Sequence, residues 1–398
     1  MKPNPINLCA AQVIKAGASD PYGTKPRFIQ IKNLELHGAA TGNTFTSLTG
    51  ATMTYGDSAG IWIQPSVDIL LENNVIYDNA FGIFTMAKDG ELAAACERIT
   101  VRNSRVYGNG RVNNYYDHNF YIQASNPVIE GNYIGQTRAG SQGSSYKSRS
   151  SGEIFRYNYV EASARAIDLV HSEDQQNGIA NLPDYGTDYV YGNIIVNDCS
   201  LGNCASNPIH YGGDNFGEQD NVVAVFNPGI KYRQRLYFFN NTVINKVMLG
   251  QSYRTHVFDL SLVGTTVEAW NNIFSFEGDS NFSWVESAGV LNLRGNNLVT
   301  RTIPKGDMSA LASNYTINNV GSLVMAASPA ALFVNPANNY NLISGAPAID
   351  RATAVPAGIT PDSRYIQTPL VGQPYMKANG ILLRSVRGTA ADLGANEF

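Results

Sequence analysis

Short apolar runs alternate with polar residues along most of the chain, and a six-residue frame recurs among them. The frame consists of an apolar residue, two variable residues, Asn, one variable residue and a second apolar residue. Its copies are LENNVI at 71–76, IEGNYI at 129–134, FRYNYV at 155–160, VYGNII at 190–195, FFNNTV at 238–243, AWNNIF at 269–274 and LRGNNL at 293–298, and VRNSRV at 101–106 has Ser104 in place of the Asn. Copies of one frame separated by loops of unequal length indicate a solenoid.

The Asn of each frame is expected to be structural. Asn tolerates the left-handed backbone conformation that a tight bend needs, and its amide can hydrogen-bond along a stack of identical neighbours. The frame positions are 74, 132, 158, 193, 241, 272 and 296. We therefore predict that Asn158 and Asn193 lie one above the other at a bend.

A second short strand precedes most copies of the frame. These segments are 60–64, 81–86, 118–123, 145–150, 166–170 and 255–261. No amphipathic helices separate them, so the pattern predicts an all-β chain, a single-stranded right-handed parallel β-helix or solenoid, rather than alternating α/β units. We expect residues 25–320 to form the β-helix catalytic domain, residues 1–24 an N-terminal cap or partial first turn, and residues 321–398 a C-terminal segment packed on the helix.

The amino-acid composition limits which kinds of molecule the protein is expected to bind. The 398 residues are 43% hydrophobic but only 15% charged, with a net charge of −4 and no stripe rich in Lys or Arg. A nucleic-acid partner is therefore not expected, and no apolar run is long enough to span a membrane. A monomer is expected. Because no hydrophobic signal core follows Met1, the chain is either cytoplasmic or a secreted or periplasmic protein without its leader, and the second is favoured.

The four cysteines include Cys199 and Cys204 in the segment DCSLGNC. This separation can close a small disulfide loop, and we predict that the two pair; four unrelated free thiols are the alternative. No CxxC or paired His-Cys spacing suggests zinc.

Candidate chemistry is concentrated between Tyr115 and His171. Counting back from the frames aligns Tyr121 with Lys147 one turn later. Strand alternation then predicts that Asn119, Tyr121 and Gln123 point outward, as do Lys147 and Arg149 in the next turn and Asp168 in the turn after. His118 and His171 lie at the strand ends, His210 extends the column, and Tyr116 is a candidate for stacking on sugar rings.

These residues carry a resemblance to known proteins. Over most of residues 25–320 the repeat resembles the pectate-lyase-like superfamily of right-handed parallel β-helices. His118-Asn119-x-Tyr121, Lys147-Ser148-Arg149 and Ile167-Asp168-Leu169 look like motifs of β-helix repeat proteins related to polysaccharide lyases. KSRSSGEIFRYNYV is similar to the Lys-Ser segment of the alginate lyase and chondroitinase B family, which implies a catalytic base at Lys147. That family's second basic residue corresponds here to Val170 and its acidic calcium ligands are not evident, so calcium dependence stays open.

The resemblance and the residue types together predict a polysaccharide lyase that cleaves a uronate-containing acidic polysaccharide by β-elimination. Arg149 would neutralise the uronate carboxylate, Lys147 would remove the neighbouring proton with its pKa lowered by like charge and burial, and Tyr121 or His118 would protonate the departing oxygen. The substrate-binding candidates are Asn119, Gln123, Asp168, His171, His210 and Tyr116.

Three alternatives remain open. A glycoside hydrolase would need two suitably spaced carboxylates, for which Asp168, Glu173, Asp174, Asp184 and Asp214 are available. A uronate epimerase would use nearly the same residues as a lyase. A non-catalytic glycan-binding or tailspike-like protein would use the fold alone.

Overall fold

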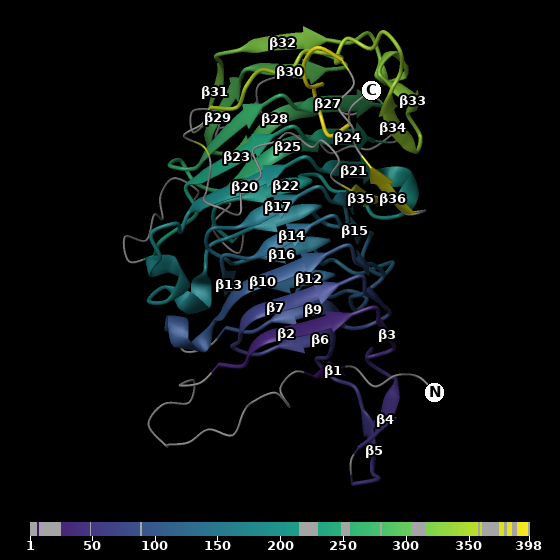
Figure 1. Ribbon diagram of the computed structural model, residues 1–398, viewed down its shortest axis with the longest axis vertical. Coiled ribbons are helices and arrows are strands. Elements are labelled where there is room, and N and C mark those ends of the chain that lie inside the picture. Colours follow the sequence, from purple (N-terminus) through teal and green to yellow (C-terminus); the bar gives the residue numbers. More distant parts are fainter. Residues whose placement is uncertain are drawn as a thin grey trace.

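The structure is a computed structural model. It describes residues 6–7, 25–47, 49–87, 90–214, 230–247, 255–278, 281–303, 315–356, 359, 374–377, 380–383 and 388–396. Three long sheets of parallel strands run along the molecule, and each turn of the chain adds one strand to each sheet. Figure 1 shows the strands stacked as successive rungs, with the N-terminal strands at one end and β31 and β32 at the other. The predicted all-β parallel β-helix is confirmed.

Sheet 1 contains the strands that bear the candidate chemistry. Its order is β1 (Ile6–Asn7), β6 (Ala59–Ile63), β9 (Phe81–Thr85), β12 (Phe120–Ile122), β16 (Tyr146–Ser148), β19 (Ile167–Leu169), β22 (Ile209–Tyr211), β25 (Thr255–Leu260) and β28 (Phe282–Ser287). All six of the short strands predicted to precede the frames belong to this sheet.

Sheets 2 and 3 lie on either side of the bend that each frame forms. Sheet 2 has the order β2 (Arg27–Lys32), β7 (Val67–Glu72), β10 (Cys96–Arg102), β14 (Val128–Glu130), β17 (Ile154–Arg156), β20 (Thr187–Tyr191), β23 (Arg235–Phe239), β26 (Thr266–Trp270), β29 (Gly289–Arg294) and β31 (Tyr315–Asn319), with β13 (Ala124–Ser125) beside β10. Sheet 3 has the order β3 (Glu35–His37), β8 (Val75–Tyr77), β11 (Arg105–Val106), β15 (Tyr133–Ile134), β18 (Tyr159–Glu161), β21 (Ile194–Asp198), β24 (Thr242–Lys246), β27 (Ile273–Glu277), β30 (Asn296–Val299) and β32 (Ser322–Met325).

The remaining elements are short. Antiparallel hairpins are formed by β4 (Thr44–Thr46) with β5 (Thr52–Thr54), β33 (Phe333–Asn335) with β34 (Asn339–Leu342), and β35 (Pro374–Lys377) with β36 (Gly380–Leu383). Single 3-10 turns are η2 (Leu92–Ala94), η3 (Glu173–Gln175), η4 (Ile179–Asn181), η5 (Cys199–Leu201) and η7 (Pro329–Ala331). The β4–β5 hairpin projects from the N-terminal end of the solenoid (Figure 1).

The frame asparagines form a buried ladder between sheets 2 and 3, as predicted. We call the set Asn74, Ser104, Asn132, Asn158, Asn193, Asn241, Asn272 and Asn297 the Asn ladder. In the central step, Asn193 Oδ1 accepts hydrogen bonds from the backbone amide of Asn158 at 2.8 Å and from its side-chain amide at 3.1 Å. The prediction that Asn158 and Asn193 stack is therefore confirmed.

Two details of the ladder differ from the prediction. The left-handed backbone belongs to the residue before the ladder Asn, with φ of 59° at Tyr157 and 56° at Asn271, because the ladder residue itself must keep its amide aligned with its neighbours. In the last frame the ladder position is Asn297 rather than Asn296. Gly295, with φ of 56°, matches Asn271 of the preceding turn, and Asn296 is an additional residue in that bend, which moves the ladder position by one.

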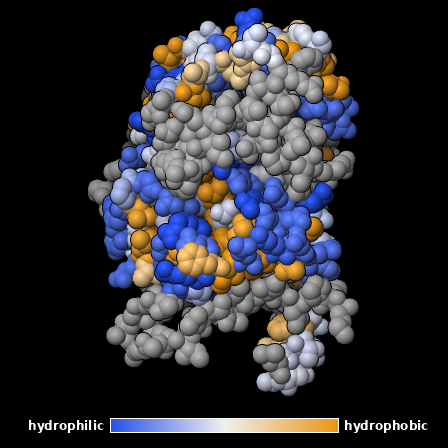
Figure 2. Space-filling model, viewed as in Figure 1, coloured by the Kyte–Doolittle hydropathy of each residue, from blue (hydrophilic) through white to orange (hydrophobic). Residues whose placement is uncertain are grey.

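Inward-facing apolar side chains fill the space between the three sheets. In sheet 2, for example, Ile129, Phe155, Val190 and Phe238 stack in register and are fully buried. The described surface in Figure 2 is mostly hydrophilic, with hydrophobic residues in small patches between. The core thus holds together an elongated scaffold whose outer faces are available for function.

Apart from β1, the predicted N-terminal cap of residues 1–24 lies outside the described residues. The solenoid continues through β32, and C-terminal side chains such as Tyr340 and Leu393 then pack against the outer faces of sheets 2 and 3. The backbone amide of Ala395 also donates to Thr242 Oγ1 at 2.9 Å. The predicted disulfide between Cys199 and Cys204 is present.

Candidate functional site

The outer face of sheet 1 presents one side chain per turn from a single register column. The column runs Trp62, Phe84, Tyr121, Lys147, Asp168, His210, Asp259 and Glu286. The neighbours of Tyr121 on its strand, Phe120 and Ile122, are fully buried, so strand alternation directs the column outward. The predicted alignment of Tyr121 with Lys147, and of Lys147 with Asp168, is confirmed. Along this column aromatic residues give way to charged ones at Lys147.

Lys147 lies between two carboxylates. Its Nζ is 3.3 Å from Asp168 Oδ2 and 3.2 Å from Asp214 Oδ2, and its side chain is 11% exposed. The sequence had suggested that the like charge of Arg149 would dominate its surroundings. In the structure two carboxylates bind the ammonium instead, so its nitrogen is not directed at a substrate. The arrangement therefore fits Lys147 poorly as a base and well as a fixed positive charge.

Arg149 connects Asp214 with Tyr121. Its Nη2 pairs with the Asp214 carboxylate, its Nη1 donates to the carbonyl of His171 at 2.8 Å, and its Nε donates to Tyr121 Oη at 2.9 Å. Gln123 Nε2 also donates to Tyr121 Oη, at 3.1 Å. The phenol oxygen thus accepts two hydrogen bonds, and its own proton must be directed elsewhere.

We call Tyr121, Lys147, Arg149, Asp168 and Asp214 the ionic cluster. Burial alone would raise the pKa of Asp168, but Lys147 and Arg165 hold that pKa well below its ordinary value. Burial alone would raise the pKa of Asp214 as well. Lys147 and Arg149 again outweigh burial and keep the pKa of this carboxyl below its ordinary value. Both carboxyl groups are therefore ionised near neutral pH, and they balance the two cations.

Two histidines flank the cluster as neutral rings. The backbone amide of Ser144 donates to His118 Nδ1 at 2.8 Å, and that of Asp214 donates to His171 Nδ1 at 3.1 Å. Burial, together with nearby cations, lowers the pKa of His118 to about 3 and that of His171 to about 4. Because Nδ1 accepts in both rings, the proton of each resides on Nε2. His118 can therefore donate a hydrogen bond, but it is not the charged acid that the predicted role requires.

His210 is fully buried and cannot contact a substrate, contrary to the prediction. Its Nδ1 lies 2.6 Å from Asp168 Oδ1 and its Nε2 lies 2.5 Å from Ser261 Oγ. The order Ser, His, Asp matches that of a hydrolytic triad, but Ser261 is only 3% exposed and its Oγ also contacts the carbonyl oxygen of Gly213 at 3.1 Å. Ser261 Oγ is therefore not exposed to attack a substrate. His210 instead orients Asp168.

The other predicted binding residues have different environments. Asn119 is fully buried: its Oδ1 accepts from Asn109 Nδ2 at 2.9 Å and its Nδ2 donates to the carbonyl of Gly135 at 2.8 Å. It belongs to a turn rather than to the outer face, so the expectation that it points outward was wrong. Gln123 is buried at the edge of the ionic cluster. Tyr116, in contrast, is 62% exposed and close enough to Asp214 to sense its charge.

Sequence reasoning did not place Arg165 and Ser144 in the site, and it named Asp214 only as a carboxylate available to a hydrolase. Asp214 follows the glycine pair after β22, and Arg165 Nη1 pairs with Asp168 Oδ1 at 3.1 Å. Ser144 Oγ donates to Asp168 Oδ2 at 3.1 Å. Their positions in the sequence could have identified them. Each of the three residues lies within three residues of a sheet 1 strand that contributes a side chain to the outward column.

A second group of charges lies inside the solenoid, behind the strand of Lys147. Ser148 Oγ donates to Glu153 at 2.5 Å, and Arg233 Nη1 lies 2.6 Å from Asp188 Oδ2. Arg233 Nε also donates to the carbonyl of Val170 at 2.8 Å. Burial raises the pKa of Glu153 to about 7. These buried contacts tie β16 and β19 together and so support the outer face that they carry.

No known protein family matches the chain, and no curated protein matches its sequence. Within the described residues, no three His, Cys, Asp or Glu side chains are grouped so that they could hold a metal ion. No helix in the described part of the chain is long and apolar enough to cross a membrane. The site must therefore be interpreted from its own geometry.

Proposed function

We propose that the ionic cluster binds the carboxylate of a uronate residue and that the protein is a polysaccharide lyase acting on an acidic polysaccharide by β-elimination. One observation carries the proposal: Lys147 and Arg149 together hold a single carboxylate, that of Asp214, directly beside the hydroxyl of Tyr121. A uronate carboxylate has the same chemistry as the Asp214 side chain. It would take the place of Asp214 between the two cations.

The reaction removes the proton on the carbon that bears the carboxylate. The electrons of that C–H bond form a carbon–carbon double bond, and the bond from the next carbon to the glycosidic oxygen breaks. Negative charge accumulates on the carboxylate as the proton leaves. Lys147 and Arg149 would stabilise that charge, because both are fixed cations in a largely buried setting.

Tyr121 is the best-placed group for proton transfer. Its oxygen accepts from Arg149 Nε and Gln123 Nε2, two donors that would stabilise the phenolate form that a base requires. That phenolate would take up the proton of the C–H bond and become a neutral phenol. It would then return a proton to the departing glycosidic oxygen. The proposal thus transfers the role of base from Lys147 to Tyr121, because Lys147 Nζ is held between the carboxylates of Asp168 and Asp214.

The surrounding residues would position the substrate and the cations. His210 and Arg165 orient the Asp168 carboxylate, which in turn pairs with the Lys147 ammonium. His118 would support Tyr121, because the two rings pack edge to face with centroids 5.5 Å apart. Tyr115 and Tyr116, whose ring centroids are 4.3 Å apart, form an exposed aromatic edge on which a sugar ring can stack.

The alternatives are less well supported by the same contacts. A glycoside hydrolase needs one carboxyl group that is protonated near neutral pH, whereas cations lower the pKa of both Asp168 and Asp214. A uronate epimerase shares the first half of the reaction and returns the proton to the opposite face. A protein that only binds glycan would have no need of two donors on the oxygen of Tyr121.

We also propose a secreted or periplasmic location, which the disulfide between Cys199 and Cys204 supports, since such bonds persist in oxidising compartments.

The test is incubation of the protein with alginate, pectate, chondroitin sulfate and hyaluronate. The ultraviolet absorbance of the unsaturated uronate product is followed. A rise with at least one polymer, lost in Tyr121→Phe and retained in the surface control Arg98→Ala, would support the lyase. Arg98 is suitable because its side chain is 50% exposed in an ion pair with Asp68 on another face.

Other outcomes identify other functions. New reducing ends without ultraviolet absorbance would indicate a hydrolase. Incorporation of solvent deuterium into an uncleaved polymer would indicate an epimerase. Binding without any chemical change would leave the protein a glycan-binding scaffold, and each of these three results would overturn the lyase proposal.

A further inference from the structure

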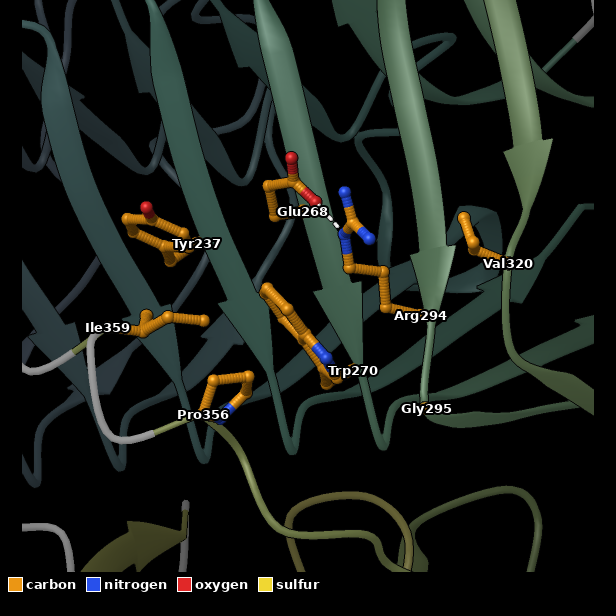
Figure 3. A pocket seen from close by; sticks show the side chains of 8 residues that line it. All are labelled: Tyr237, Glu268, Trp270, Arg294, Gly295, Val320, Pro356 and Ile359. Carbon is orange, nitrogen blue, oxygen red and sulfur yellow. Dashed lines mark hydrogen bonds and ion pairs between the residues drawn. The ribbon is translucent and has the colours of Figure 1, made fainter.

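A hollow lies on the outer face of sheet 2, away from the ionic cluster on sheet 1. Its volume is about 440 Å³, and its lining is shown in Figure 3: Tyr237, Glu268, Trp270, Arg294, Gly295, Val320, Pro356 and Ile359. The size falls within the range of small-molecule pockets. Strands β23, β26 and β29 provide the floor, and Pro356 and Ile359 of the C-terminal segment provide one wall.

Four side chains of the floor come from three neighbouring strands. In the sheet register Tyr237 pairs with Glu268, and Trp270 pairs with Arg294. Glu268 and Trp270 point outward together because Val267 and Ala269, which alternate with them, are fully buried. Two aromatic rings therefore lie beside one carboxylate and one guanidinium, as Figure 3 shows.

The charged pair keeps unused hydrogen-bonding capacity toward the hollow. Arg294 Nε pairs with Glu268 Oε2, and Asn292 Nδ2 donates to Glu268 Oε1 at 2.9 Å. Among the described residues, the terminal nitrogens of Arg294 have no side-chain partner, and the arginine side chain is 39% exposed. Each carboxylate oxygen can accept a further hydrogen bond. The site thus offers donors and acceptors side by side with no net charge.

We propose that this hollow is a glycan-binding site that takes the pyranose ring of a neutral sugar residue. A pyranose has an apolar face of C–H groups that can pack on the partly buried ring of Tyr237 and on the part of Trp270, 6% of the residue, that stays exposed. Hydroxyls on its rim can both donate to Glu268 and accept from Arg294. An anionic ligand would meet the Glu268 carboxylate. The ligand class therefore differs from the uronate proposed for the ionic cluster, and the inference does not depend on that function.

The experiment is isothermal titration calorimetry of the intact protein with cellotetraose, maltotetraose, mannotetraose and laminaritetraose, and separately with trigalacturonate. We expect at least one neutral tetrasaccharide to bind. Arg294→Ala should weaken that binding about tenfold or more, because it removes charge-assisted hydrogen bonds. Arg294→Lys, which keeps the charge but loses the fork of donors, should weaken it less.

Arg102→Ala is the matched control. Arg102 belongs to the same outward column of sheet 2, is also 39% exposed and also pairs through Nε with a glutamate, Glu72 at 2.6 Å, but it lies outside the hollow. Its substitution should leave the affinity unchanged. Melting temperatures of all three variants verify that each is folded.

Three results would overturn the proposal. The wild-type protein could bind none of the neutral tetrasaccharides, or Arg294→Ala and Arg294→Lys could both bind as tightly as the wild type. Trigalacturonate binding that is lost in Arg294→Ala would show that the hollow takes anions. None of these results bears on turnover at the ionic cluster.

Discussion

The Asn ladder and the outward column of sheet 1 run along the same solenoid and follow opposite rules. Seven of the eight ladder positions are Asn, and each side chain bonds to the next turn in the same way. The outward column changes from Tyr121 to Lys147, Asp168 and His210 in four successive turns.

The difference separates structural demands from functional ones. Every turn makes the same bend, so the same buried amide satisfies the same backbone groups each time. On the outer face of sheet 1, the fold does not require the same side chain in every turn. A run of different ionisable groups there, all partly or fully buried and paired with one another, costs desolvation energy that the fold does not require. Such a run is therefore the place to look for function.

Tyr121→Phe should have the largest effect on activity. Removing the hydroxyl leaves the ring packed against Phe84 but removes the proposed proton-transfer group, so turnover of a uronate polymer should fall by about 10²- to 10⁴-fold. The melting temperature should stay within about 2 °C of the wild type. A large loss of stability with no loss of turnover would make the column structural, like the ladder.

Asn193→Ala should mainly destabilise the fold. The substitution takes the buried acceptor from the backbone amide of Asn158 and a buried donor from the carbonyl of Phe155, and it leaves Asn241 Oδ1 with the backbone amide of residue 193 alone. The free energy of unfolding should therefore fall by about 3 kcal/mol. Urea denaturation measures it. The control is Asn296→Ala, where the side chain only donates to the carbonyl of Arg351 at an exposed position and the loss should stay below about 1 kcal/mol. Equal losses would contradict the ladder register.

His118 should make stability fall with acid. Its folded-state pKa is about 3 against 6.5 for the free side chain, so the unfolded chain takes up the proton first as pH falls. The stabilisation is complete above pH 6.5 and is lost progressively down to about pH 3, at up to about 1.4 kcal/mol per pH unit.

Urea denaturation at pH 7 and pH 5, on the wild type and on His118→Gln, isolates this contribution from the carboxyl groups that titrate in both. The variant should lose less stability between the two pH values than the wild type. Parallel losses would show that His118 is not buried as a neutral ring.

Tyr116→Ala should have the smallest effect. The ring is exposed at the edge of the site, so its loss should raise KM about three- to tenfold and leave kcat unchanged. Steady-state kinetics on the responsive polymer separate the two constants. A fall in kcat instead would place Tyr116 within the reacting geometry.

Much of the scaffold could be predicted because its signals are local. Counting back from the frames was enough to align Tyr121 with Lys147, and the frames identified Asn158 and Asn193 as stacked neighbours. The disulfide between Cys199 and Cys204 followed from a short separation. Each of these inferences concerns residues that are close in sequence or related by one repeat.

The failures concern residues whose environment depends on distant loops. Asn119 has the same parity as Tyr121 but turns inward to join Asn109 and Gly135, because a buried turn needed its amide. His210 was expected on the surface but is covered, with Ser261 against its Nε2. Hydrogen bonding thus outweighed strand parity at Asn119, whereas His210 keeps its place in the outward column and is buried there.

The sequence by itself determined the repeat, the strands, the ladder and the column that carries Tyr121, Lys147 and Asp168. These features follow from periodicity alone, because successive side chains of a strand point to opposite faces of the sheet. Only the tertiary structure decided which charges meet. Asp214 reaches Lys147 and Arg149 from a turn more than sixty residues away in sequence. Loops of unequal length carry no period, so their meeting points depend on packing rather than pattern.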